Sequence, residues 1–218
     1  MNKAFLKNNK HFLTLTLFLI LTLWFAYLKK TIIPVHIMDS YLDSKIPFLK
    51  EFVLAYYFWF LYMAIGFLYL GFVSKKDFYK LELFLALGMS ISFIIFILYP
   101  NAQFPRPIVK GKDMFSFLVN FIYNHDGTNN VFPSIHVCNA IGVHLVLINC
   151  QDFKNRIVLK NLSLAGMLAI CASTVFIKQH SIIDVFGGTA LAFIIYSCIY
   201  LLPKLFSQNS SVANEFQE

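Results

Sequence analysis

The stretch IIDVFGGTALAFIIYSCIYLL, residues 182–202, decides the fold, because it is an apolar run long enough to cross a lipid bilayer as a helix. The chain holds five more such runs, at residues 12–28, 52–73, 81–99, 133–150 and 162–177. Short charged connectors separate them, which is typical of a helix bundle and not of a barrel with alternating apolar and polar residues. We therefore predict an all-α, polytopic membrane protein with a six-transmembrane-helix bundle.

The composition supports a membrane location for most of the chain. Of its 218 residues, 58% are hydrophobic and 13% are charged, and the mean hydropathy is +0.66. A soluble globular domain does not need so much apolar side chain. We expect residues 1–206 to form a single transmembrane domain and the polar residues 207–218 to form a flexible C-terminal tail.

The longest connector, residues 101–130, predicts a different kind of helix. Apolar residues recur in it at helical spacing, namely Met114, Phe117, Leu118, Phe121 and Ile122. Such a stripe is typical of a short amphipathic helix that rests on the membrane surface. We therefore expect an interfacial helix in this third connector.

The net charge of +7 comes from Lys and Arg residues that lie mostly in the connectors. At such places basic residues set the orientation of the chain and contact lipid headgroups, so we expect no nucleic-acid partner. With six spans, the side of the termini carries a modest excess of basic residues once Arg106 and Lys178 are assigned to chemistry. This bias predicts cytoplasmic termini in a plasma membrane and an active site on the extracytoplasmic face.

The most informative polar residues open the run at residues 182–202. In the stretch KQHSIID, residues 178–184, His180 and Asp184 are four residues apart, and a helix would place them on one face. An aspartate that faces an imidazole fixes its tautomer and raises its basicity. A polar pair that joins two helices is the simpler alternative, but ionisable groups in a membrane segment usually mark a functional site. We place this pair at the centre of a candidate active site, with Lys178 as a nearby positive charge.

Two further polar clusters are expected on the same side of the membrane. Arg106 has a planar guanidinium that suits phosphate oxygens, although a lone arginine is equally a headgroup anchor. In PSIH, residues 133–136, a proline opens a helix whose free N–H groups and Ser134 hydroxyl offer an anion site. His136 could pass a proton to a leaving oxygen. Taken alone, this cluster would be a helix cap beside an interface histidine.

Together the clusters supply cations, helix-start N–H groups, two histidines and a carboxylate. Phosphoryl transfer depends mainly on positioning and charge stabilisation, so this set of groups suits it. A metal site is the competing interpretation for two histidines and one aspartate. Because Arg106 and Lys178 would oppose a bound cation, we expect a phosphate site with no metal.

In order and spacing, the clusters resemble those of the type 2 phosphatidic acid phosphatase (PAP2) superfamily of membrane lipid phosphatases. The family pattern is Lys-x6-Arg-Pro, then Pro-Ser-Gly-His, then Ser-Arg-x5-His-x3-Asp. The matching residues are Arg106, Pro107, Pro133, Ser134, His136, Ser173, His180 and Asp184. The resemblance covers roughly residues 99–188.

The chain departs from this pattern at three positions. Tyr99 stands where the family lysine would be, Thr174 where its arginine would be, and Ile135 where its glycine would be. Two phosphate-binding cations are therefore missing, and Lys178 is a candidate replacement for one of them. The residues next to the two histidines are similar to those in the branch that contains inositol phosphorylceramide synthase and sphingomyelin-synthase-like enzymes. Enzymes of that branch move phosphoryl headgroups to alcohols.

The resemblance implies a role for each residue. His180 would attack phosphorus and form a phosphohistidine, and Asp184 would hold its ring. His136 would protonate the leaving oxygen and then activate water or an acceptor alcohol. The phosphoryl oxygens would be held by Arg106, Ser134 and Lys178. No metal and no organic cofactor is implied.

The resemblance thus implies a lipid phosphatase that hydrolyses a phosphomonoester or diphosphate of phosphatidic acid, phosphatidylglycerophosphate or polyprenyl diphosphate type. The alternative is a phosphotransferase that moves a phosphoryl headgroup from a phospholipid to a lipid alcohol. A non-catalytic transporter fits less well, because the spans show no symmetry between two halves. The expected partners are the bilayer and a membrane lipid phosphate, and the sequence indicates no oligomeric state.

Overall fold

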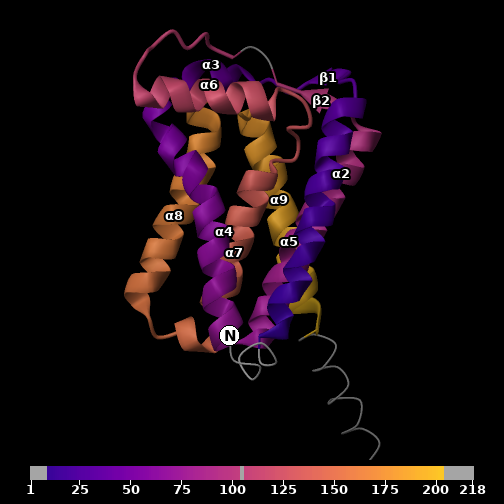
Figure 1. Cartoon of the computed structure of the whole chain (residues 1–218), viewed down its shortest axis with the longest axis vertical. Coiled ribbons are helices and arrows are strands. Elements are labelled where there is room, and N and C mark those ends of the chain that lie inside the picture. The colour runs from indigo at the N-terminus through magenta and orange to yellow at the C-terminus, as the bar shows by residue number, and fades with distance from the viewer. Residues whose placement is uncertain (1–8, 104–105, 204–218) are drawn as a thin grey trace, which may run out of the picture.

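Eight α-helices form most of the computed structural model, which describes residues 9–103 and 106–203 (Figure 1). They are α2 (Leu17–Thr31), α3 (Tyr41–Lys45), α4 (Val53–Val73), α5 (Lys75–Leu98), α6 (Met114–Asp126), α7 (Ile135–Asn149), α8 (Ile157–Phe176) and α9 (Ile182–Tyr196). Short helical segments extend or follow them, namely η1 (Lys10–Thr16), η2 (Lys50–Phe52), η3 (Gln151–Phe153) and η4 (Ser197–Leu201). Two short strands, β1 (His36–Ile37) and β2 (Asn101–Ala102), pair in parallel.

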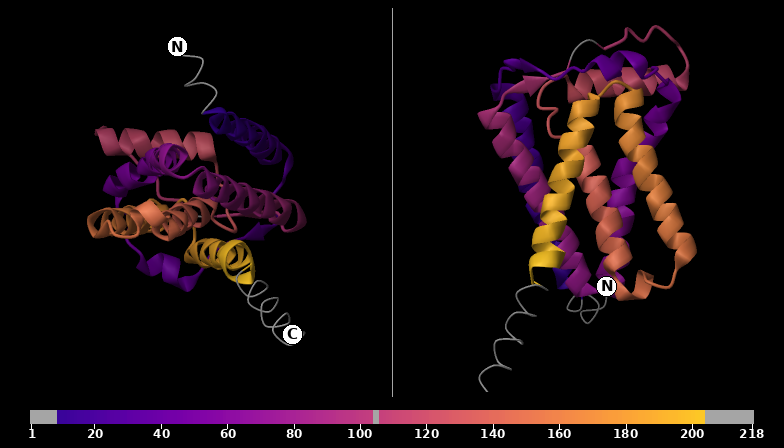
Figure 2. Two further views of the ribbon diagram at one scale, coloured as in Figure 1. Left: turned by 90° about the horizontal axis from the view of Figure 1, so that it is seen from below. Right: turned by 180° about the vertical axis from the view of Figure 1, so that it is seen from behind.

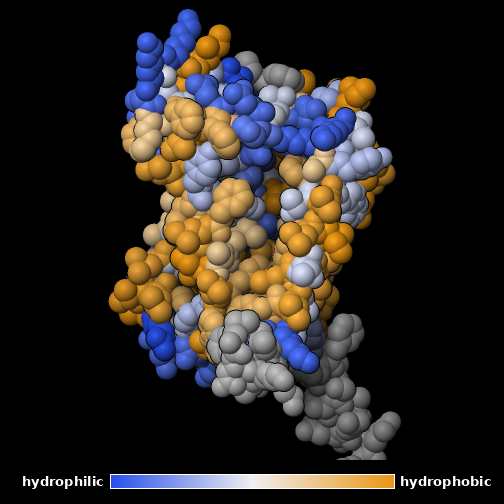
Figure 3. Space-filling view, in the orientation of Figure 1, coloured by the Kyte–Doolittle hydropathy of each residue, from blue (hydrophilic) through white to orange (hydrophobic). Residues whose placement is uncertain are grey.

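Within the described residues, five helical segments are long and apolar enough to cross a membrane, namely Lys10–Thr31, Lys50–Val73, Lys75–Leu98, Ile157–Phe176 and Ile182–Leu201. They lie alongside one another as a bundle (Figures 1 and 2). Large apolar side chains such as Phe60, Leu98 and Phe193 are exposed on their outer faces. Figure 3 shows the result, a hydrophobic belt between two more hydrophilic ends. The prediction of a polytopic all-α membrane bundle is confirmed.

Helix α7 runs through the middle of this bundle and is shorter than its neighbours (Figure 1). It has 15 residues, which at about 1.5 Å per residue gives roughly 22 Å, less than the ~30 Å hydrocarbon core of a bilayer. The apolar run 133–150 is longer, but the chain first descends into the bundle and only then becomes helical. Five of the six predicted spans are therefore confirmed, and a crossing by α7 stays a prediction.

The buried face of the bundle explains how α7 is held at the centre. It packs against α4, α5, α8 and α9, and most of its residues are buried. The main core cluster joins it to large side chains of these helices, including Phe84, Ile170 and Leu191. A Cβ atom at Gly142 would lie 2.5 Å from the Phe84 ring, so the absence of a side chain there allows α5 and α7 to approach closely.

Helix α6 lies across one end of the bundle (Figure 1), where the sequence predicts an interfacial helix. Its apolar residues divide between two surroundings. Val119 and Ile122 are buried against a cluster that contains Val53, whereas Met114 and Phe117 are exposed. One part of the apolar surface of α6 therefore packs on the ends of its neighbours and another part faces outward, and its position at a membrane interface stays a prediction.

Two helices begin earlier in the chain than predicted. Helix α5 begins at Lys75 because the Ser74 side chain accepts a hydrogen bond from the Asp77 N–H and caps it. Helix α8 begins at Ile157. The predicted tail, residues 207–218, lies outside the described residues. Both ends of the described chain lie at the end of the bundle opposite α6 (Figure 1).

Candidate active site

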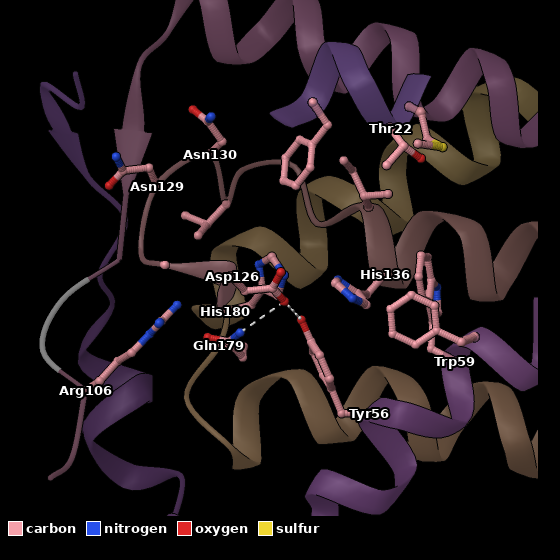
Figure 4. A pocket seen from close by; sticks show the side chains of 16 residues that line it. Thr22, Tyr56, Trp59, Arg106, Asp126, Asn129, Asn130, His136, Gln179 and His180 are labelled. Atoms are coloured by element: carbon pink, nitrogen blue, oxygen red, sulfur yellow. Dashed lines mark hydrogen bonds between the residues drawn. The ribbon is translucent and has the colours of Figure 1, made fainter. Parts of the chain in front are cut away.

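A cavity of about 290 Å³ lies beneath the end of the bundle that α6 covers. Its polar lining comes from parts of the chain that are far apart, and Figure 4 shows Tyr56, Arg106, Asp126, His136, Gln179 and His180 around it. Its apolar lining includes Phe25 of α2, Trp59 and Phe60 of α4, and Met89 of α5. The cavity therefore offers polar groups to one part of a ligand and an apolar wall to another.

His180 lies on the short loop between α8 and α9. The Thr174 carbonyl at the end of α8 accepts hydrogen bonds from the N–H groups of Gln179 and His180, at 2.9 and 3.0 Å. The His180 side chain donates from Nδ1 to Asp184 Oδ2 at 3.3 Å, as the four-residue spacing predicts. This contact assigns the proton to Nδ1 and leaves Nε2 available to attack an electrophile.

The Asp184 carboxylate also starts helix α9. Its Oδ2 atom accepts a second hydrogen bond, from the Ser181 N–H at 3.0 Å, in a capping box. Asp184 is completely buried, and its Oδ1 atom has no hydrogen-bond partner within the described residues. One buried carboxylate thus fixes both the helix start and the orientation of the His180 ring.

Helix α3 supports this loop from outside. Asp43 accepts hydrogen bonds from the Ser181 hydroxyl at 2.5 Å and the Ile182 N–H at 2.8 Å. The Lys178 ammonium donates to the carbonyls of Asp43 and Ile46. These bonds hold α3 against the loop that carries His180.

The same contacts show where the Lys178 side chain lies. Its backbone has a φ of 54°, and its side chain extends to α3 and does not line the cavity. Burial lowers the pKa of its ammonium, and the nearby Asp43 carboxylate opposes that shift. The structure therefore shows Lys178 bound to α3 and away from the cavity lining, and its predicted phosphate contact stays a prediction.

His136 lies in the first turn of α7, opposite His180. The two ring centroids are 5.8 Å apart at an interplanar angle of 60°. The rings of Tyr56 and Trp59 flank His136 at 4.4 and 4.5 Å. These two aromatic rings form an apolar wall beside the imidazole. Within the described chain, neither ring nitrogen of His136 has a hydrogen-bond partner in the protein.

Ser134 joins α7 to α9 and does not line the cavity. Its N–H donates to the Asp184 carbonyl at 3.1 Å, and its hydroxyl accepts from the Val137 N–H at 3.4 Å. A Cβ at Gly188 would lie 2.5 Å from the Ser134 carbonyl oxygen, so the absence of a side chain there allows α7 and α9 to approach closely. The structure shows Ser134 as a buried helix cap, and the phosphate contact predicted for its hydroxyl stays a prediction.

Arg106 brings the fixed positive charge to the cavity. Its guanidinium lies 4.8 Å from the centre of the Tyr123 ring. Burial lowers its pKa, and Tyr123 opposes that shift, but an arginine stays charged. Its Nε atom is buried and has no hydrogen-bond partner among residues 9–103 and 106–203. An unpartnered buried donor beside two histidines indicates an anionic ligand.

Several residues that line the cavity are not among the predicted site residues. Asp126 accepts hydrogen bonds from the Tyr56 hydroxyl at 2.9 Å and the Gln179 amide at 3.4 Å (Figure 4). Asn130 has a φ of 60°, and both atoms of its buried amide lack partners in the described structure. Asparagine adopts a positive φ more readily than most residues, so the unpartnered buried amide is the informative feature, and it is not visible in the sequence.

Asn101 positions the segment that leads into α7. Its side-chain oxygen accepts from the N–H groups of Val131 and Phe132 at 2.9 and 2.8 Å, and its amide donates to the carbonyls of Tyr99 and Phe132. All the hydrogen-bonding capacity of this buried amide is used on the backbone. Asn101 therefore fixes the path of the backbone segment that leads to His136.

A family model described as the PAP2 superfamily matches residues 83–207, more than half of the chain. The chain belongs to the PAP2 superfamily. PAP2 enzymes are metal-independent phosphatases that act on phosphate esters. No curated protein and no solved structure matches the chain. Arg106, His136 and His180 lie inside the matched segment, whereas α2, α3 and α4 lie outside it.

Two departures from the PAP2 pattern have clear structural consequences. Tyr99 stacks on His36, with ring centroids 3.9 Å apart, and does not line the cavity. Thr174 is completely buried, and its carbonyl holds the loop that carries His180. In the described part of this PAP2 protein, neither position brings a cation to the site, and no group of three or more His, Cys, Asp or Glu residues is arranged to hold a metal ion.

Proposed function

We propose that this PAP2 protein hydrolyses a phosphomonoester or diphosphate of a membrane lipid through a phosphohistidine on His180. The observation that carries the proposal is the facing pair of imidazoles, 5.8 Å apart, beside the unpartnered Arg106 guanidinium. One imidazole is held by a carboxylate and the other is flanked by aromatic rings, so the two are prepared for different tasks.

In the first step, Nε2 of His180 attacks phosphorus while Arg106 and the free N–H groups at the start of α7 hold the phosphoryl oxygens. A nitrogen–phosphorus bond forms and the bond from phosphorus to the lipid oxygen breaks. A protonated His136 gives its proton to that oxygen, so the lipid product leaves without added charge. Asp184 stabilises the positive charge that remains on the phosphorylated ring.

In the second step, the now neutral His136 takes a proton from water as the water oxygen attacks phosphorus. The nitrogen–phosphorus bond breaks, and its electron pair returns to Nε2 of His180. Inorganic phosphate leaves, and His136 is again protonated for the next cycle. The two histidines thus exchange no proton directly, and each returns to its starting state.

A lipid substrate is supported by the apolar wall of the cavity. Phe25 of α2 and Trp59 of α4 line it from two helices whose outer faces carry exposed apolar side chains. In Figure 3 the surface is hollowed over the region between these helices. A headgroup at the histidines would therefore leave its acyl or prenyl chain against apolar side chains, consistent with phosphatidic acid, phosphatidylglycerophosphate or polyprenyl diphosphate.

The placement in the membrane is part of the same proposal. With α7 as a sixth crossing, both ends of the described chain lie on one side, which agrees with their common position in Figure 1. The modest excess of Lys and Arg on that side favours the cytoplasm. The active site then faces the extracytoplasmic side of the plasma membrane, under α6.

A phosphotransferase is the second candidate, and the surroundings of His136 favour it. The rings of Tyr56 and Trp59 place this base on the apolar side of the cavity, where a lipid alcohol could replace water as the acceptor. This reaction is that of the branch containing inositol phosphorylceramide synthase. The chemistry of the two steps is otherwise unchanged.

A panel of lipid phosphates, presented to the purified protein in detergent with a chelator, tests the function. We expect inorganic phosphate to be released from at least one lipid monophosphate or diphosphate, at a rate that the chelator does not change. Addition of lipid alcohols should not alter the products. No phosphate release without an alcohol, but a new phospholipid with one, would replace hydrolysis by transfer. No reaction under either condition would refute both.

A further inference from the structure

Helix α2 contributes to the cavity although it lies outside the segment that matches the PAP2 family. Thr22 and Phe25 of this helix line the cavity. Lys29 follows Phe25 by four residues, so it lies on the same face of the helix, one turn nearer the end that α6 covers. Its neighbour Lys30 is exposed.

The Lys29 ammonium lies at the rim of the cavity. Its Nζ atom is 3.9 Å from Asp126 Oδ1, and it donates a hydrogen bond to the His125 carbonyl. Its Cε atom is 3.5 Å from the place where a Cβ at Gly127 would lie. Asp126 and Gly127 both line the cavity, so the ammonium is next to residues that a ligand would contact.

The charge of the expected ligand exceeds what the lining supplies. A phosphomonoester carries roughly −1.5 to −2 at neutral pH. Among the described residues that line the cavity, Arg106 is the one fixed cation, and Asp126 adds a negative charge beside it. Lys178 is directed to α3. Lys29 is the nearby cation that can make up this difference.

The present contacts of Lys29 leave it free to move to a ligand. Its distance of 3.9 Å from a carboxylate whose side chain is 42% exposed describes a weak ion pair. A lysine side chain has a flexible four-carbon stem and three donors, so a small rotation can bring the ammonium to a phosphate oxygen. The carbonyl of His125 and the Asp126 carboxylate keep it near the rim until then.

We propose that Lys29 binds the phosphoryl oxygens of the substrate as the second cation of the site, with Asp126 as its positioning residue. This inference rests on the proposed function. It assigns a substrate contact to a helix outside the matched segment.

Comparison of Lys29→Gln with Lys30→Gln tests the inference, because the two lysines are adjacent and only Lys29 reaches the rim. Loss of one charge-assisted contact should raise KM and the inhibition constant of orthovanadate by about tenfold or more, with a smaller change in kcat. Lys29→Arg should recover most of the loss. Lys30→Gln should match the unsubstituted protein in both constants, and thermal unfolding should be alike in all three variants.

The outcomes separate this inference from the function it rests on. Hydrolysis by the unsubstituted protein, with equal KM and inhibition constants in Lys29→Gln and Lys30→Gln, would overturn the role of Lys29 and leave the function intact. If the protein hydrolyses no lipid, the proposed function fails. The role of Lys29 is then tested by the binding of orthophosphate. Thermal stabilisation by orthophosphate that Lys29→Gln loses and Lys30→Gln keeps would support it. Equal or absent stabilisation would overturn it.

Discussion

Replacement of His180 by alanine is expected to lower turnover of a lipid phosphate by about 10⁴-fold or more, because the proposed nucleophile is removed. The fold should survive, since Asp184 keeps its hydrogen bond from the Ser181 N–H and still caps α9. Phosphate release by purified protein, normalised to folded protein in a thermal unfolding assay, measures the effect.

His144→Ala is the matched control for this variant. His144 is also a buried histidine, but it lies in α7 beyond the cavity, where its Nδ1 contacts the Ser163 hydroxyl at 3.0 Å. We expect its turnover to stay within about threefold of the unsubstituted protein, because it touches no proposed substrate atom. Turnover by His180→Ala comparable to that of His144→Ala would exclude His180 as the nucleophile.

Replacement of His136 by alanine is expected to lower turnover by about 10²- to 10⁴-fold, the usual effect of losing a general acid and base. The loss should be smaller for the first step with an aryl phosphate, whose leaving oxygen needs no proton. The second step still lacks its base. We therefore expect a burst of aryl alcohol, equal in amount to the enzyme, followed by slow release of phosphate.

Rapid-quench kinetics with an aryl phosphate measure this burst. His144→Ala again serves as the control, because it removes an imidazole from the same helix. The account requires the burst to be larger relative to the steady rate in His136→Ala than in the control. Equal slowing of both steps would assign His136 to substrate binding and not to proton transfer.

The sequence was most informative where local geometry alone fixes the contact. His180 and Asp184 are four residues apart at a helix start, so their hydrogen bond follows from helix geometry whatever surrounds them. The convergence of Arg106, His136 and His180 on one cavity needed one further step, the shared side of the membrane. The order of the apolar runs along the chain predicts that these three residues lie on the same side of the membrane.

Lys178 shows where this reasoning stops. It is two residues from His180, and this short separation favours a prediction that both residues contact the phosphate. The direction of its side chain depends on a positive φ and on the docking of α3, more than 130 residues away in the chain. Neither is visible in the sequence. The same limit applies to Ser134, whose burial results from the contact of α7 with Gly188.

The residues that were not predicted as part of the site make contacts between distant parts of the sequence. Lys29 and Asp126 come from α2 and α6, and Asn101 holds the backbone at Val131 and Phe132. No periodicity links such positions. Hydropathy also could not give the exact ends of α7, because Pro133 and Ser134 at the start of the predicted run precede the helix and Cys150 follows it.

Trapping of the covalent intermediate tests the central claim most directly. Substrate is mixed with His136→Ala protein, the reaction is quenched in base within its first turnover, and phosphopeptides are located by mass spectrometry. The account predicts an acid-labile phosphate on His180 in an amount close to that of the enzyme. Phosphate on another residue, or phosphate release with no phosphorylated enzyme at any time, would contradict it.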